Sequence, residues 1–144
     1  NNIGIFGWSY GGFMSSLCIT KGADVFKSAI AVAPVTNWRY YDNIYTERFM
    51  QKPQDNGENY DINSPINHVE KLKGKYLLIH GTADDNVHFQ NATEMVSALV
   101  NKNKQFEFFA YPDKNHGIYG GFTRLHLYTK MTNFLMETLM EDNE

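Results

Sequence analysis

Short apolar segments alternate with segments of helical character along the chain. Residues 26–35 and 75–81 are almost continuously apolar, which is typical of strands buried on both faces of a parallel sheet. Residues 3–6 and 105–112 predict two further strands. Because turns and helical patterns separate these runs, the sequence predicts an α/β fold with a mostly parallel sheet of about four strands and flanking helices.

The helical segments differ in how clearly they are marked. Residues 11–19 are small and apolar, and residues 91–101 follow a turn after the third strand. The last segment spaces its apolar residues by three or four positions, which predicts an amphipathic helix closing on the core. Residues 37–73 are polar and aromatic and show no clear periodicity. The apolar positions of the last helix are Leu125, Tyr128, Met131, Leu135 and Leu139.

Composition narrows the function classes. The 144 residues carry a net charge of −3 and show no cluster of Lys and Arg, so we expect no nucleic-acid partner. No apolar run approaches the roughly 18 residues needed to cross a bilayer, so we expect no membrane contact by this segment. Cys18 is the single cysteine, which excludes an intrachain disulfide and a Cys-rich zinc site. Because the chain enters a strand without an initiating methionine, we expect sequence upstream of it.

A single serine stands between glycines directly after the first predicted strand. Gly7 and Gly11 lie two positions to either side of Ser9. Gly-x-Ser-x-Gly at a strand-to-helix junction is the nucleophile elbow of α/β-hydrolases, a turn so sharp that we expect side chains at Gly7 and Gly11 to clash. The helix N-terminus that follows favours developing negative charge. Ser9 is therefore the candidate nucleophile, although an ordinary glycine-rich turn would give the same pattern.

A serine nucleophile needs a base, and the base needs an acid that orients it. In α/β-hydrolases the order along the chain is Ser, then Asp or Glu, then His, with the last two on loops after later strands. Asp84 and Asp85 follow the third predicted strand, and His116 follows the fourth. Spacing does not choose between the two aspartates, because the other one could cap the following helix.

Other histidines are weaker candidates for the base. His80 falls within a predicted buried strand, His126 in the last helix and His68 in the segment without periodicity. A metal cluster of His80, His88 and the two aspartates is the remaining alternative. His80 should point into the sheet while His88 begins the next element, so we predict no metal site and no cofactor.

These motifs together resemble the prolyl oligopeptidase family, and within it the dipeptidyl peptidases, over nearly all of the chain. The carriers are GWSYGG at residues 7–12, VFKSAIAVAPVTNWRYYDNIYTERFM at 25–50, LLIHGTADDNVHFQ at 77–90 and NHGI at 115–118. A generic esterase is not expected to combine this elbow, the tyrosine-rich block and the turn with two aspartates.

The resemblance implies catalytic roles for four of these residues. Ser9 would be the nucleophile, Asp84 the acid and His116 the base. The backbone N–H of Tyr10 would donate to the oxyanion, which needs fixed donors where its charge develops. Asn86 would form a hydrogen bond near the substrate carbonyl.

The resemblance also gives the tyrosine-rich segment a purpose. Tyr41 and Tyr45 are four positions apart and are expected to meet on one helical face. With Val35, Trp38 and Val87 they would form an apolar pocket for proline or alanine at the second position of the substrate. Without the resemblance, ordinary core packing would be the favoured interpretation of these aromatic residues.

The resemblance implies that residues 1–144 are the C-terminal part of a peptidase domain. The N-terminal β-propeller and the first half of the hydrolase domain would be absent, and with them a tyrosine of the oxyanion hole and glutamates for the substrate's amino group. We therefore expect a fragment with little or no activity alone. The strand at residues 3–6 would be an exposed edge, which we expect a second chain or a rearrangement to cover.

The function implied is a serine peptidase that releases N-terminal dipeptides from peptide substrates through an acyl-enzyme. The resemblance further implies a homodimer and a periplasmic, secreted or outward-facing membrane-anchored location. An oligopeptidase or acylaminoacyl peptidase of the same family, or a non-catalytic interaction module, are the alternatives. Asn91-Ala92-Thr93 is a weak signal for glycosylation.

Overall fold

The computed structural model describes residues 2–140, and a parallel sheet forms its centre. The four strands lie side by side in chain order, each parallel to its neighbour. The predicted α/β fold is thus confirmed. Because all strands are parallel, their carboxyl ends lie at one edge of the sheet, where loops can bring distant residues together. The strands are β1 (Gly4–Trp8), β2 (Ser28–Val32), β3 (Lys75–Gly81) and β4 (Glu107–Tyr111).

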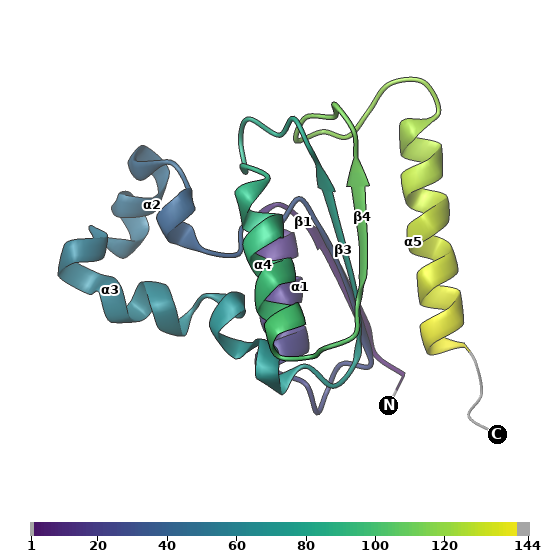
Figure 1. Ribbon diagram of the computed structural model, residues 1–144, viewed down its shortest axis with the longest axis horizontal. Helices are drawn as coiled ribbons and strands as arrows, with labels where there is room; N and C mark the ends of the chain where they lie inside the picture. The colour runs from purple at the N-terminus through teal and green to yellow at the C-terminus, as the bar shows by residue number, and fades with distance from the viewer. Residues whose placement is uncertain (1, 141–144) are drawn as a thin grey trace.

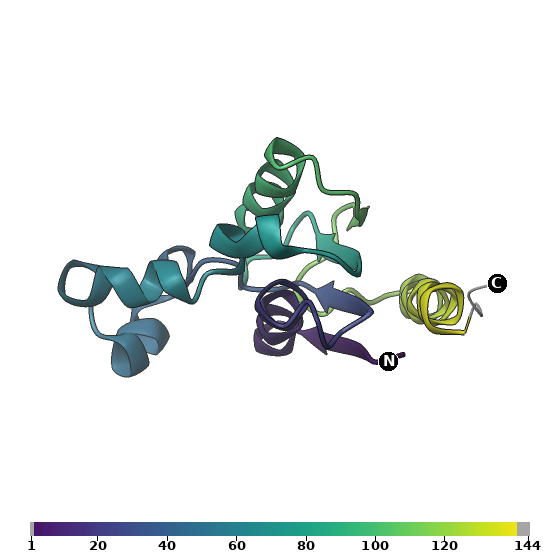
Figure 2. The same cartoon turned by 90° about the horizontal axis from the view of Figure 1, so that it is seen from below.

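Helices cover both faces of this sheet (Figures 1 and 2). One face carries α1 (Tyr10–Lys21) and α4 (Gln90–Asn101), and the opposite face carries α5 (Thr123–Leu139). The side chains of β2 are completely buried and alternate between the two layers: Ala29 and Ala31 pack towards α1 and α4, whereas Ile30 and Val32 pack towards α5. This burial on both faces explains why the strand is apolar without interruption.

The segment between β2 and β3 projects from the side of the sheet as a small helical unit (Figure 1). Its lack of periodicity gave no sign of this helical structure. Local signals define the helices instead: the side chain of Asp42 caps α2 by accepting from the N–H of Ile44, and Pro53 begins α3. The helices are η1 (Trp38–Tyr40), α2 (Asn43–Met50), α3 (Pro53–Ile62) and η2 (Pro65–Lys71).

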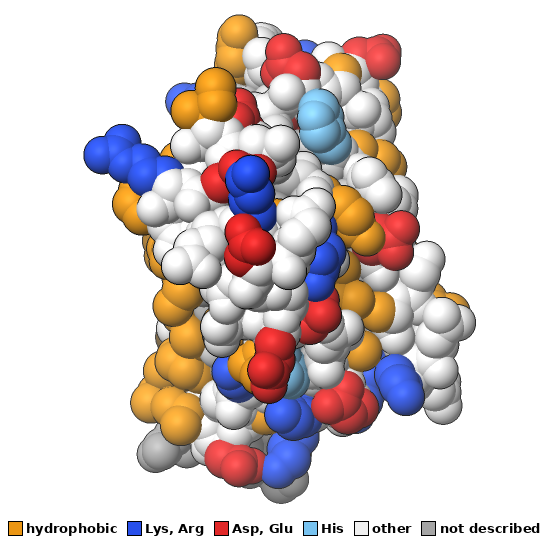
Figure 3. All heavy atoms as spheres, turned by 90° about the vertical axis from the view of Figure 1, so that its left-hand side faces the viewer, with side chains coloured by type: hydrophobic (Ala, Val, Ile, Leu, Met, Phe, Trp, Pro, Cys, Tyr) orange, Lys and Arg blue, Asp and Glu red, His pale blue; other side chains and the backbone are white. Residues whose placement is uncertain are grey.

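Polar contacts hold this unit together. The guanidinium of Arg39 donates to the carboxylate of Asp61 at 3.0 Å and to the carbonyl of Gly57 at 3.1 Å, which joins η1 to α3. On the end of the molecule that this unit forms, charged side chains of both signs are interspersed with apolar ones (Figure 3). Ile44 and Phe49 of α2 are among the exposed apolar side chains.

Two expectations about local structure have different outcomes. Tyr41 and Tyr45 do meet, with ring centroids 5.4 Å apart, but they do not share a helical face because Tyr41 precedes the N-cap Asp42. β1 is an edge strand, and Phe6 on it is 63% exposed, as expected. That another chain or a rearrangement covers this edge stays a prediction. Among residues 2–140, no helix combines the length and apolar character required to span a membrane.

Candidate active site

The turn between β1 and α1 has the shape of a nucleophile elbow. Ser9 has φ 59° and ψ −115°, and a positive φ of this size is a strained backbone conformation that residues other than glycine rarely adopt. Its N–H donates to the carbonyl of Val32 at 2.8 Å, which fixes the turn to the neighbouring strand. Tyr10 begins α1, so its N–H has no partner within the helix and is available to a ligand.

The glycines around Ser9 have different functions. A side chain at Gly7 would collide with the backbone of Gly11, so the turn requires glycine at this position. A side chain at Gly11 would meet nothing within 4 Å, so the expectation of a clash there is wrong. Gly12 instead faces a crowded site, because a side chain would lie 2.9 Å from Pro34. This contact brings α1 close to the segment that follows β2.

Asp84 lies at the carboxyl end of β3 with its side chain completely buried. Its Oδ1 accepts hydrogen bonds from the N–H groups of Asn86 at 3.0 Å and Val87 at 2.9 Å. Its Oδ2 lies 2.7 Å from Nδ1 of His116 and 3.2 Å from Nε2 of His80. Burial by itself would raise the pKa of Asp84, but the hydrogen bonds from His116, His80 and the backbone outweigh it and hold the pKa well below its usual value.

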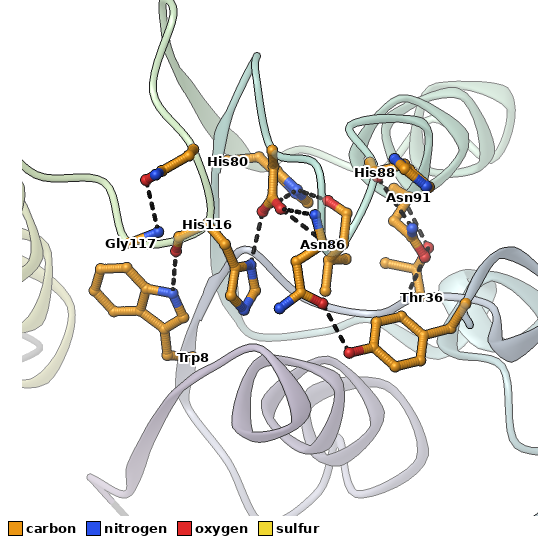
Figure 4. Close-up of polar contacts among 12 residues, drawn as sticks. Trp8, Thr36, His80, Asn86, His88, Asn91, His116 and Gly117 are labelled. Carbon is orange, nitrogen blue, oxygen red and sulfur yellow. Dashed lines mark hydrogen bonds and ion pairs between the residues drawn. The ribbon is translucent and has the colours of Figure 1, made fainter. Parts of the chain in front are cut away.

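The imidazole of His116 is oriented by this carboxylate (Figure 4). Because Asp84 is ionised, it accepts from Nδ1–H, which leaves Nε2 of the neutral ring with a free lone pair. The backbone of the same loop is also held, since the indole N–H of Trp8 donates to the carbonyl of His116 at 2.9 Å. Trp8 directly precedes Ser9, so this bond ties the loop of His116 to the elbow.

Of the remaining polar candidates, only His80 contacts Asp84. Asp85 and His88 are exposed. His80 is completely buried, and its Nε2–H donates to the carbonyl of Val87 at 2.8 Å. His126 contacts the hydroxyl of Tyr111 at 2.7 Å, and His68 lies near the carbonyl of Ile62. No cluster of His, Cys, Asp and Glu suited to a metal ion occurs within residues 2–140.

Beside the elbow, residues of α1, η1 and α2 line a pocket of about 520 Å³ that is open to solvent. Half of its lining residues are aromatic. The ring of Trp38 stacks on Tyr45, with ring centroids 6.0 Å apart, and meets Phe13 edge to face at 5.2 Å. Val35 and Val87 are buried in the same apolar cluster as Phe13 and Trp38, but they are not among the residues that line the pocket. The pocket is lined by Tyr10, Phe13, Met14, Leu17, Trp38, Tyr45, Thr46, Phe49, Met50 and Asn63.

Tyr41 and Asn86 line a neighbouring, more polar cavity of about 740 Å³. The hydroxyl of Tyr41 donates to Oδ1 of Asn86 at 2.7 Å, which links the tyrosine-rich segment to the turn of Asp84. Partial burial is the main cause that raises the pKa of Tyr41, with the nearby Tyr45, Asp42 and Asp84 adding to it. The phenol therefore remains a donor at neutral pH.

Sequence reasoning missed several neighbours of these residues. Phe13 and Leu17 line the pocket from α1, and their spacing of four positions is the signal that could have found them. The contact between His80 and Asp84 has no such signal, because His80 lies in β3 and Asp84 in the turn that follows it, where the helical spacing rule does not apply. The indole bond from Trp8 has no counterpart in the sequence pattern.

The parallel sheet and the serine elbow at its carboxyl edge place the chain in the class of α/β-hydrolase folds. The profile of the prolyl oligopeptidase family matches residues 1–142, and the chain belongs to this family. It is similar to prolyl endopeptidase FAP of Mus musculus, with 51% identity over 138 residues, and to dipeptidyl peptidase 4 of Felis catus, with 47% identity over 138 residues. Each alignment covers 94% of this chain and 18% of the relative.

A solved structure gives the same result. The crystal structure of Porphyromonas gingivalis dipeptidyl peptidase 4 superimposes with a TM-score of 0.93 and 49% identity. The match covers 95% of this chain and 20% of that one. The chain thus spans about a fifth of the length of its relatives.

Proposed function

We propose that this chain carries the triad of a serine peptidase that releases N-terminal dipeptides. The observation that carries the proposal is the 2.7 Å contact between Nδ1 of His116 and Oδ2 of Asp84, on loops at the sheet edge where the strained Ser9 also lies. Ser, Asp and His follow one another in the chain order of α/β-hydrolases.

Each group has a step in the proposed reaction. His116 takes the proton of the Ser9 hydroxyl at Nε2 as Oγ attacks the substrate carbonyl, and it later gives this proton to the leaving amine. Asp84 stabilises the imidazolium that forms, because it stays ionised and accepts from Nδ1. The N–H of Tyr10 donates to the oxyanion, and water then releases the acyl group from Ser9.

The apolar pocket would hold proline or alanine at the second position of the substrate. Trp38 and Tyr45 line this pocket, the ring of Tyr41 packs against both of them, and Val35 and Val87 are buried in the same apolar cluster as Trp38. The side chain of Asn86, which accepts from Tyr41, would donate its amide N–H towards the substrate carbonyl. This arrangement suits a compact apolar residue followed by a reactive carbonyl.

The proposal extends to the whole protein. Residues 1–144 would be the C-terminal part of the catalytic domain, and further segments would supply a propeller, a second oxyanion donor and groups for the substrate's amine. Losing one oxyanion donor typically costs about 10²- to 10³-fold in rate, so this chain alone would have little activity. A homodimer and a periplasmic, secreted or outward-facing location are part of the same proposal.

A second candidate is cleavage after internal proline residues. Its support is the similarity, at 51% identity, to a relative named prolyl endopeptidase. An oligopeptidase is supported only by the name of the family, and an acylaminoacyl peptidase and a non-catalytic interaction module are supported by none of the relatives named above.

The test is hydrolysis of chromogenic amides by the full-length protein and by its Ser9→Ala variant. We expect cleavage of Gly-Pro and Ala-Pro amides that the substitution abolishes. Succinylated Gly-Pro amide, which has no free amine, separates the two candidates, because only an endopeptidase cleaves it. No cleavage of any of these amides, or cleavage that Ser9→Ala leaves intact, would contradict the proposal.

A further inference from the structure

Asn91, in the first turn of α4, has a completely buried side chain. Both its amide oxygen and its amide nitrogen form hydrogen bonds (Figure 4). Its Oδ1 accepts from the N–H of Thr36 at 3.0 Å, and its Nδ2 donates to the carbonyl of His88 at 3.0 Å. The hydroxyl of Thr36 donates to the carbonyl of Asn91 at 2.8 Å. A buried network of this kind is rigid, because breaking one bond leaves its partner unsatisfied.

The bonds join two segments that each contribute residues to the buried apolar cluster next to the pocket, Val35 and Trp38 from one and Val87 from the other. Thr36 lies between Val35 and Trp38, on the segment that leads from β2 to η1. Asn91 lies in the first turn of α4, four residues after Val87, which is on the segment that leads from β3 to α4. The hydroxyl of Ser64, which is also buried, donates to the carbonyl of Thr36 at 2.7 Å and fixes this segment from a third side.

The network lies next to the catalytic groups without touching them. Asp84 and His116 have their own bonds, none of which involves Asn91 or Thr36. Apolar contacts alone set the spacing of Val35 and Val87 loosely, because such contacts have no preferred direction. The directional bonds of Asn91 supply a fixed spacing next to the aromatic walls.

We propose that Asn91 and Thr36 form a clamp that sets the width of the apolar pocket and so its selectivity for proline over alanine. Both are positioning residues, since they act through Val35, Trp38 and Val87 rather than on the substrate. The proposal rests on the proposed function of the same site. It adds a specificity determinant outside the pocket itself.

The same bonds bear on the sequon at Asn91. A glycan is attached through Nδ2, and here this atom is buried and donates to His88. The folded chain therefore offers Asn91 as a structural side chain and not as a glycan acceptor. Thr93 of the sequon lies on the exposed side of α4, so the two positions can be tested separately.

The experiment compares hydrolysis of Ala-Pro and Ala-Ala amides by variants of the full-length protein. We expect Asn91→Ala to raise KM for the prolyl substrate and to lower the ratio of kcat/KM for proline over alanine about tenfold, the size of effect that one methylene causes in an apolar pocket. Thr36→Val removes the hydroxyl at nearly constant volume and should lower the ratio in the same direction. Thr36→Ser keeps the hydroxyl, so this variant should keep the ratio of the unsubstituted protein.

Two controls separate the clamp from other causes. Thr93→Ala destroys the sequon but leaves Asn91 in place, so the ratio should not change. The rate at which diisopropyl fluorophosphate inactivates Ser9 reports the triad without filling the pocket with proline, and it should stay within about twofold in Asn91→Ala.

The outcomes distinguish the two proposals. The clamp proposal would be overturned if Asn91→Ala kept the normal ratio of kcat/KM, or if kcat/KM for both substrates and the inactivation rate all fell by the same factor. The proposed function would stand in either case. A full-length protein that hydrolyses neither amide would overturn both.

Discussion

The sheet edge and the helical unit beside it are built in different ways. At the edge, Ser9 and Asp84 are held by backbone hydrogen bonds and strand register, and the carboxylate is completely buried. Where the helical unit meets the pocket, aromatic rings pack on one another: Trp38 contacts Tyr41 and Tyr45 of the unit and Phe13 of α1, and Tyr45 is 44% exposed. The residues at the edge are therefore held rigidly by directional hydrogen bonds, whereas the walls of the pocket depend on packing against a partly exposed segment.

This difference predicts how the two regions respond to change. Directional bonds to a charged group fail completely when one partner is lost, so substitutions at the edge should lower kcat. Apolar contacts fail by degrees, so substitutions in the pocket should act mainly on KM and on selectivity.

The largest effect is expected for Asp84→Asn. An amide in place of the carboxylate favours the wrong tautomer of His116, and the loss in kcat should be about 10⁴-fold, as when the acid of a Ser-His-Asp triad becomes an amide. Steady-state hydrolysis of Ala-Pro amide by the full-length protein measures it. Asp85→Asn is the matched control, because Asp85 is exposed, and it should retain normal kcat. Equal losses in the two variants would argue against the assignment of Asp84.

The elbow comes next in size. Gly7→Ala places a methyl group against the backbone of Gly11, which cannot move without disturbing Ser9. We expect a loss of about 1–3 kcal/mol in stability, seen as half-inactivation at lower urea concentration. Gly57→Ala in α3, where the nearest atom would be Nη2 of Arg39 at 3.4 Å, should change this midpoint little. A Gly7→Ala protein as stable as the Gly57→Ala protein would show that the turn tolerates a side chain.

Most of the sheet, and the candidate residues at its carboxyl edge, could be predicted from the sequence. β3 begins and ends where its apolar run does, and β2 lies within the predicted strand, because burial on both faces leaves a continuous apolar signal. The elbow glycines and the order of Ser9, Asp84 and His116 could be predicted for a different reason, because the catalytic geometry demands particular residues in a particular order along the chain.

The helical unit could not be predicted in this way. Its helices are short and are set by capping at Asp42, the position of Pro53 and the long-range bonds of Arg39. None of these gives a period along the sequence. The clamp between Thr36 and Asn91, 55 positions apart, is likewise a product of the fold. The pocket was therefore recognised only through the family resemblance.

A smaller effect should mark the link between the two regions. Tyr41→Phe removes the hydroxyl that donates to Asn86 and leaves the ring contacts with Trp38 and Tyr45 in place. One hydrogen bond of this kind corresponds to about a threefold to tenfold loss in kcat/KM. The control is Tyr45→Phe, whose hydroxyl makes no hydrogen bond within residues 2–140, and its kcat/KM should be near normal. A loss in both variants of the same size would assign the effect to the rings.

The smallest effect concerns pH and stability, and it tests whether the buried edge is as rigid as its bonds imply. The pKa of Asp84 is lowered in the folded chain, so the unfolded chain binds more protons below the ordinary carboxyl value of about 3.9. The contribution of Asp84 is therefore complete above that value and is lost as the pH falls towards the lower folded pKa. At pH 3.5 the loss should be less than about 1 kcal/mol, measured as faster hydrogen exchange of residues 77–90 after correction for the intrinsic rate. Asp84→Asn cannot titrate and should lack this dependence, and a dependence that persists in the variant would place its origin in another group.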